Sequence, residues 1–179
     1  MGKKKSTKRP LVILDAIEIE FRPALSEPVV PQRQLQFRDF AEVRAELTRL
    51  CAGGYQKLGQ WDLAQTCDHL TYFIQGSLDG HPYKVPWLLK VLFGRLVLRR
   101  ILKERRMKPG GPTPQKPLPS PGGDEAAAVA RLEQMLARLE AHTGEMHASP
   151  FFGYLTPEQW RELHLIHCAH HFGFLAPGA

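Results

Sequence analysis

The sequence lacks long hydrophobic runs and is poor in cysteine. No stretch of its 179 residues approaches the roughly eighteen consecutive apolar side chains of a transmembrane helix, so no such helix is expected. A secretory signal is not expected either, because the apolar run 11–14 is short and ends at Asp15 without a small-residue cleavage site. Three widely spaced cysteines do not make a disulfide framework. These absences predict one domain in a reducing cytoplasm.

The net charge of +6 is concentrated in two segments. Residues 1–9 carry five cations, and residues 84–108 carry nine cations with one acid, so the rest of the chain is acidic. The basic composition therefore describes a tail and one segment rather than a nucleic-acid-binding face, and no nucleic acid is expected as a partner. Residues 1–34 are expected to form a disordered or extended basic arm, with room for one strand around residues 11–21.

Apolar residues recur at three- and four-residue steps in four segments, which predicts four amphipathic helices. Two of the expected starts carry capping signals. Asp62 can cap the second helix, and Thr156 with Gln159 three residues later can form a capping box for the last one. The predicted helices span residues 37–52, 62–77, 124–143 and 156–174.

A fifth helix, basic and amphipathic, is predicted over residues 87–106, between the second and third of these helices. Residues 108–123 hold six prolines and four glycines, a composition that predicts a long loop. Residues 35–176 are expected to form the domain, and no multi-strand pattern appears in them. The predicted fold class is therefore all-α, a four-helix bundle to which the basic helix is an addition.

Four histidines lie within eight residues of the last predicted helix. At 100° per residue, His164, His167 and His171 share a stripe about 60° wide, whereas His170 falls to one side. His167 and His171 are an i, i+4 pair, the spacing at which one helix face offers two imidazoles to one metal ion. Imidazole suits zinc, nickel, copper and iron. A metalloprotease helix is excluded, because Cys168 stands where the glutamate base would follow the first histidine.

Two histidines leave a divalent ion under-coordinated, so a third ligand should come from another helix. His69 is the first candidate because it lies in the middle of the second predicted helix. His81 and His147 lie in predicted loops and His142 at a helix end, which makes them weaker candidates. The alternative for any one histidine on an apolar face is a core residue with a hydrogen-bond partner. Spacing alone leaves both readings open.

Three stretches make the sequence similar to a known superfamily: Gly59–Leu70, Ser77–Gly80, and Pro150–Trp160 with the histidines that follow. They resemble the DinB-like superfamily of four-helix-bundle metalloenzymes, and more closely a branch known as a domain of unknown function. The resemblance covers roughly residues 35–175. It implies that His69, His167 and His171 bind a divalent metal ion, commonly zinc or nickel.

The sequence also departs from this resemblance. Some relatives have a histidine directly before the Pro-Phe-Phe-Gly stretch, whereas here Ser149 holds that place and His147 stands two residues earlier. An additional ligand at that position is therefore not expected. Superfamily members of known activity are thiol-dependent transferases and isomerases that use low-molecular-weight thiols. Their thiol-binding residues are not motif-like and cannot be carried over to this chain.

The first functional hypothesis is a metal-dependent transferase or related enzyme acting on a small molecule, with a low-molecular-weight thiol as one partner. An open coordination position could activate either a thiol or a water, so a hydrolase remains an alternative. Gln65, one turn before His69, could orient a ligand or a water, and an ordinary helix residue is the alternative. His164 could be a base, a fourth ligand or a core residue, and the last is favoured. His170 lies beside the stripe. No catalytic residue is assigned, and the resemblance is compatible with a homodimer.

The competing hypothesis is a non-enzymatic metal-binding or partner-binding protein. Residues 87–106 carry seven cations against one acid next to an apolar side, as helices on anionic membrane surfaces do. The cations gather in the C-terminal half of this helix, where the helix dipole favours them without any ligand. A solvated helix that covers the bundle is therefore the alternative explanation.

Overall fold

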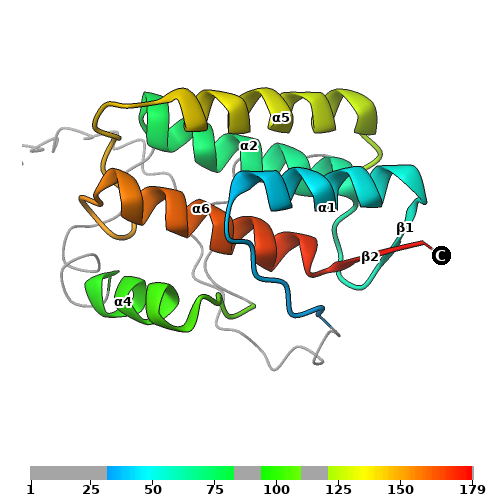
Figure 1. Cartoon of the computed structure of the whole chain (residues 1–179), viewed down its shortest axis with the longest axis horizontal. Coiled ribbons are helices and arrows are strands. Elements are labelled where there is room, and N and C mark those ends of the chain that lie inside the picture. Colours follow the sequence, from blue (N-terminus) through cyan, green and yellow to red (C-terminus); the bar gives the residue numbers. More distant parts are fainter. Residues whose placement is uncertain (1–31, 83–93, 110–120, 179) are drawn as a thin grey trace, which may run out of the picture.

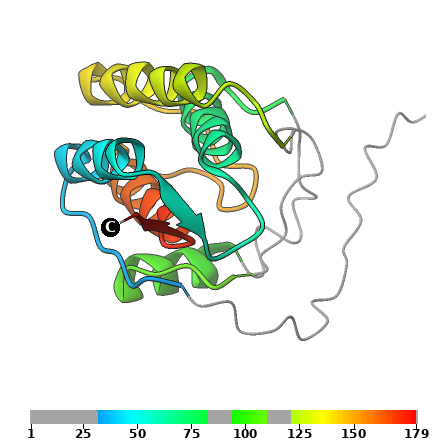
Figure 2. The ribbon, with the colours of Figure 1, turned by 90° about the vertical axis from the view of Figure 1, so that its right-hand side faces the viewer.

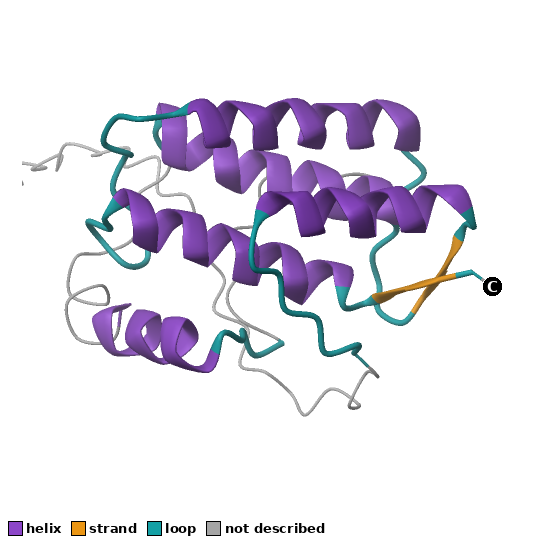
Figure 3. Ribbon diagram, viewed as in Figure 1, coloured by secondary structure: helices purple, strands orange, loops and turns teal. Residues whose placement is uncertain are grey.

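The computed structural model describes residues 32–82, 94–109 and 121–178, and within them the chain is mostly helical (Figures 1 and 3). The predicted all-α class is confirmed, apart from one pair of three-residue strands. The helices are α1 (Phe40–Ala52), α2 (Leu63–Asp79), α4 (Arg95–Glu104), α5 (Glu125–Ala141) and α6 (Pro157–Phe172), and the strands are β1 (Tyr55–Lys57) and β2 (Leu175–Pro177).

Side-chain caps mark the starts of α1, α2, α5 and α6. The cap predicted at Asp62 is present, and Gln65 completes it to a capping box that was not predicted. The capping box predicted for Thr156 and Gln159 is present at the start of α6. The predicted start of the first helix at residue 37 is wrong by three residues. The Asp39 side chain accepts a hydrogen bond from the Glu42 N–H, so α1 begins only after Asp39. The apolar pattern in the sequence begins before the helix does, because Phe37, which precedes the cap, is also buried in the core.

Helices α1, α2, α5 and α6 enclose the core. Helix α2 packs against α5 and α6, α1 packs against the same two helices, and α4 packs on the outside of α6 (Figure 2). The inward stripes are aliphatic, as their sequence period predicts. The largest fully buried aliphatic side chains are Val43, Leu47, Leu50, Leu63, Leu70, Ile74, Leu132, Leu136, Leu139 and Leu175.

A two-stranded sheet joins the α1–α2 connection to the end of α6. Strands β1 and β2 are antiparallel, with Tyr55 opposite Pro177, and the contact continues through a 2.8 Å hydrogen bond from the Leu58 N–H to the Phe174 carbonyl. A Cβ at Gly178 would clash with the Gly53 carbonyl oxygen, so the close approach needs glycine there. Three-residue strands have too little sequence for a period-2 pattern, which is why the sheet was not predicted.

Several predictions fall partly or wholly outside the described residues. Helix α4 covers the C-terminal part of the predicted basic helix 87–106, whereas residues 87–93 are not described. Most of the predicted loop 108–123 and of the arm 1–34, including the suggested strand at 11–21, also lies outside. Among the helices in the described parts of the chain, none has the length and apolar character needed to cross a bilayer.

Candidate metal centre

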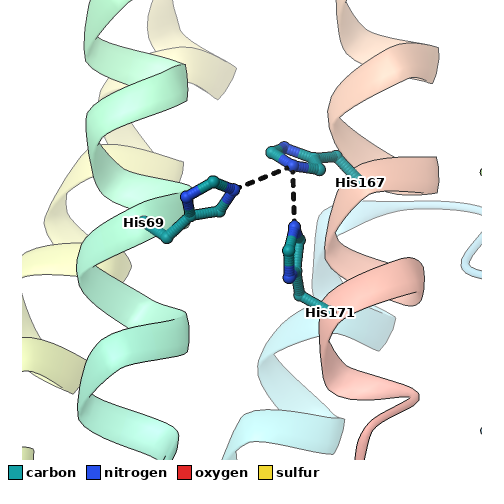
Figure 4. A group of neighbouring side chains, drawn as sticks. All are labelled: His69, His167 and His171. Atoms are coloured by element: carbon teal, nitrogen blue, oxygen red, sulfur yellow. Dashed lines mark hydrogen bonds between the residues drawn. The ribbon is translucent and has the colours of Figure 1, made fainter. Parts of the chain in front are cut away.

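Three histidine side chains converge between α2 and α6 (Figure 4). The Nε2 atom of His167 lies 3.2 Å from Nε2 of His69 and 3.0 Å from Nε2 of His171. One ligand atom from each residue can be chosen so that all three lie within 4.8 Å of one another. The structure thus brings together the three histidines that the sequence singled out.

The two helices run antiparallel where they supply these side chains. The last turns of α6 carry His167 and His171 one turn apart, so both rings leave the helix on the same side. His69 lies on the inward face of α2 and is only 4% exposed. His167 and His171 are partly exposed as whole residues, so the cluster lies near the surface of the domain.

The spacing of the three nitrogens fits a metal ion. Zinc–nitrogen bonds of about 2.0–2.1 Å in a tetrahedral site put neighbouring ligand nitrogens about 3.3 Å apart. The two Nε2 pairs at 3.2 and 3.0 Å are close to that separation. Hydrogen bonds alone satisfy the cluster poorly, because Nε2 of His167 has either one proton or one lone pair to share between two neighbours. An ion would accept a lone pair from all three rings.

Burial keeps these imidazoles in the form that binds metal. Desolvation, followed by the charge of His170, lowers the pKa of His69 to about 4. Desolvation and the neighbouring imidazoles hold the pKa values of His167 and His171 well below the ordinary value. All three rings are therefore neutral at neutral pH, and a neutral ring is the one that can coordinate.

Two aromatic side chains hold the imidazole rings in place. Trp61 stacks on His171, with ring centroids 5.2 Å apart and planes 4° from parallel, and its centroid lies 4.7 Å from that of His69. Phe73 packs against His69 at 4.8 Å and edge-on against His167 at 5.0 Å. These roles were not predicted. The spacing of Phe73, four residues after His69, could have indicated its contact.

Gln65 and His170 are two of the three residues, with His164, that were suggested to support the ligands. The side-chain oxygen of Gln65 accepts a 3.1 Å hydrogen bond from the Asp62 N–H, which closes the capping box of α2. His170 is contacted by Gln32, whose amide nitrogen donates to the His170 carbonyl at 2.8 Å and lies 3.2 Å from Nδ1. The His170 ring still packs edge-on against His171, with centroids 4.9 Å apart.

His164 is buried and links α6 to α2. Its Nε2 lies 2.9 Å from Oγ of Ser77, and the Ser77 hydroxyl donates to the Ile74 carbonyl at 2.7 Å. Because that donation uses the only hydroxyl proton, Nε2 of His164 must be the donor in the other contact. The ring also stacks on Trp160, with centroids 5.2 Å apart. His164 therefore fastens together the two helices that carry the candidate ligands.

We expect the buried His164 to make the protein less stable in acid. Burial, with a smaller contribution from His81, lowers its pKa to about 3, whereas the unfolded side chain titrates near its ordinary value. The unfolded state then binds more protons below about pH 6.5, so stability falls as the pH falls. This residue alone should cost about 2 kcal/mol of unfolding free energy between about pH 7.5 and pH 5.

Urea unfolding of metal-free protein at the two pH values measures this cost. His164→Gln keeps an amide donor for Ser77 but does not titrate, so its stability should depend less on pH than that of the wild type. If the unfolding free energies of the wild type and of His164→Gln depended equally on pH, His164 would not be a source of the acid sensitivity.

The other chemically reactive side chains lie outside the cluster. Cys168, next to His167 in sequence, is fully buried, and burial raises the pKa of its thiol to about 12, so it stays protonated. His142 is partly exposed, and its Nε2 lies 3.2 Å from the Glu145 carbonyl oxygen. Ser149 organises a turn, in which its hydroxyl oxygen accepts hydrogen bonds of 3.2 Å from the N–H groups of Phe151 and Phe152.

Comparisons with known proteins give one match. The family described as "Protein of unknown function (DUF1569)" matches residues 30–178. No curated protein and no solved structure matches the chain. The match covers both helices of the histidine cluster and the sheet behind it.

Proposed function

The chain belongs to the DUF1569 family, and from its histidine cluster we propose that it is a divalent-metal-dependent enzyme. The observation that carries this proposal is the convergence of His69, His167 and His171: Nε2 of His167 lies 3.2 and 3.0 Å from Nε2 of the other two, and one ligand atom of each residue lies within 4.8 Å of the others. Three neutral imidazoles leave coordination positions open, as in catalytic rather than structural zinc sites. Zinc or nickel suits this donor set.

We also assign the fold to the DinB-like superfamily. In this assignment α1, α2, α5 and α6 form the four-helix bundle, and α4 is the addition between its second and third helices. The support is the sequence resemblance over residues 35–175, together with the helix order and the ligand positions on the second and last bundle helices. Fold alone does not give activity, so the reaction class is argued from the site.

The surrounding residues suit a reactive site. Trp61 and Phe73 pack on the ligand rings and limit their rotation, which fixes the directions of the three nitrogen lone pairs. The partial exposure of His167 and His171 as whole residues places the cluster near the surface of the domain. A bound divalent ion would supply Lewis-acid chemistry and lower the pKa of a thiol or water at the open position.

The reaction class we favour is transfer of a low-molecular-weight thiol to an electrophilic carbon of a small substrate. The sulfur forms a bond to that carbon, the leaving group departs with its bonding electron pair, and the thiol proton goes to solvent. No described cysteine of this chain is assigned as the nucleophile, because Cys67 and Cys168 are buried and Cys51, on α1, is not grouped with the histidines. The thiol would therefore come from the small molecule. Activation of water instead would make the enzyme a hydrolase.

Metal content tests the proposal first. We expect untagged protein, analysed by mass spectrometry, to contain close to one equivalent of zinc or nickel per chain, or to take up one equivalent after chelation. A screen of small thiols against electrophilic substrates should then find consumption that stops with chelator and resumes with metal. Protein that neither contains nor takes up either metal would overturn the proposal. Protein that binds the metal but turns over no substrate in the screen would be a metal-binding protein, and the proposal that it is an enzyme would be overturned.

A further inference from the structure

The solvent face of α4 combines cations with exposed aliphatic side chains. Residues 94–109 carry seven cations and one acid. Among the large hydrophobic side chains of the described residues, three are markedly exposed, and two of these, Leu96 at 65% and Val97 at 46%, are neighbours on α4. Leu98, on the opposite side of α4, is buried against the domain. The helix therefore packs on α6 with Leu96 and Val97 facing solvent.

Three cations lie on the same helix face as Leu96. Arg99, Arg100 and Lys103 follow Leu96 by three, four and seven residues, so all three lie on its side of the helix. All three are exposed. The single acid, Glu104, is paired with Arg100 at 2.8 Å. Within the described parts of the chain, Arg99 and Lys103 have no ion pair, so their charges are available to a partner.

We propose that this face of α4 docks on an anionic membrane surface, with Leu96 and Val97 entering the headgroup layer and Arg99 and Lys103 contacting lipid phosphates and carboxylates. Charge complementarity argues for an anionic partner. Leu96 and Val97, next to these cations, argue for lipid rather than nucleic acid. Apolar side chains gain nothing from contact with a phosphate backbone, but they leave water when they enter the membrane interface. The contact is peripheral, since the apolar side of α4 is already used against α6.

The docking surface does not depend on the metal. Helix α4 lies on the outside of α6, away from α2, whereas the histidine cluster lies between α2 and α6 (Figures 2 and 4). A failure of docking therefore leaves the metal centre untouched, and loss of the metal leaves the docking face intact. One consequence is that the candidate active site would work close to a membrane.

Vesicle sedimentation of the full chain tests this proposal. We expect binding to phosphatidylcholine vesicles that contain roughly 30% phosphatidylserine, little binding to phosphatidylcholine alone, and loss of binding between roughly 0.05 and 0.5 M salt. Arg99→Glu with Lys103→Glu should weaken binding by at least about tenfold. Leu96→Ser with Val97→Ser should weaken it severalfold without changing the charge.

The matched control carries the same charge change elsewhere. Arg38→Glu with Lys57→Glu alters two exposed residues outside α4, one just before α1 and one on β1. Binding should stay within about twofold of wild type if local contacts rather than net charge decide it. Equal weakening in the control and the α4 variant would overturn the proposal, because it would indicate a charge effect without a site. Equal binding to both vesicle types would also overturn it. So would binding of DNA in the same salt series without binding of vesicles.

Discussion

His167→Ala is expected to lower the affinity for zinc by more than about 100-fold, the largest effect predicted for this protein. Loss of groups that merely support metal ligands typically costs about 10–100-fold, and His167 is the central member of the cluster. Its Nε2 is the atom that lies within 3.2 Å of both other Nε2 atoms. Without the His167 ring, the remaining ligand candidates are one imidazole on α2 and one on α6, and the i, i+4 pair on α6 is lost.

Competition with a chromophoric chelator measures the affinity. His142→Ala is the matched control, because it removes a partly exposed histidine outside the cluster and should leave zinc binding unchanged. Trp61 gives a second readout: its stacking on His171 should make its fluorescence respond to zinc in the wild type but not in His167→Ala. Unchanged affinity in His167→Ala would remove the basis for the metal centre.

Metal binding should also appear as stability. A ligand that binds only the folded state adds about 4 kcal/mol at a free concentration of about a thousand times its dissociation constant. Zinc should therefore raise the melting temperature of the wild type and of His142→Ala by several degrees, and that of His167→Ala hardly at all. A rise in all three proteins would indicate binding elsewhere.

The second large effect is expected from the buried carboxylate of α1. Glu46 is only 1% exposed, and it is paired with Arg33 and, at 2.6 Å, with Arg49. The same Arg33 side chain donates to the Phe172 carbonyl at the end of α6. Arg33→Met removes the less exposed partner, and we expect it to lower the free energy of unfolding by about 3 kcal/mol, since a buried charge loses most of its compensation.

Urea unfolding measures this loss. Arg38→Met is the matched control, because it breaks an arginine–glutamate pair on the solvent side of α1 and should have little effect. The double variant Arg33→Met with Glu46→Leu should recover much of the stability, because a buried ion pair and a packed apolar pair are often equivalent. A small effect of Arg33→Met alone would indicate that Arg49 and water compensate Glu46.

The sequence by itself determined the helices and the choice of ligand candidates. Apolar spacing and capping residues are local features of the chain. They were therefore enough to locate the helices along the sequence and to predict where α2 and α6 start. The i, i+4 pair His167 and His171 is also local. His69 could be selected because it lies within a helix, and the resemblance implied the same residue.

Only the tertiary structure decided what surrounds those ligands. Trp61 stacks on His171 close to the β1–β2 pairing, which brings residues 55–58 against residues 174–177 and has no sequence pattern. The contact of His164 with Ser77 likewise depends on the register between α2 and α6. Side chains distant in sequence meet only when whole helix faces pack, and that packing is set by the entire core. Local sequence therefore fixed which side chains share a helix face, and packing fixed which faces meet.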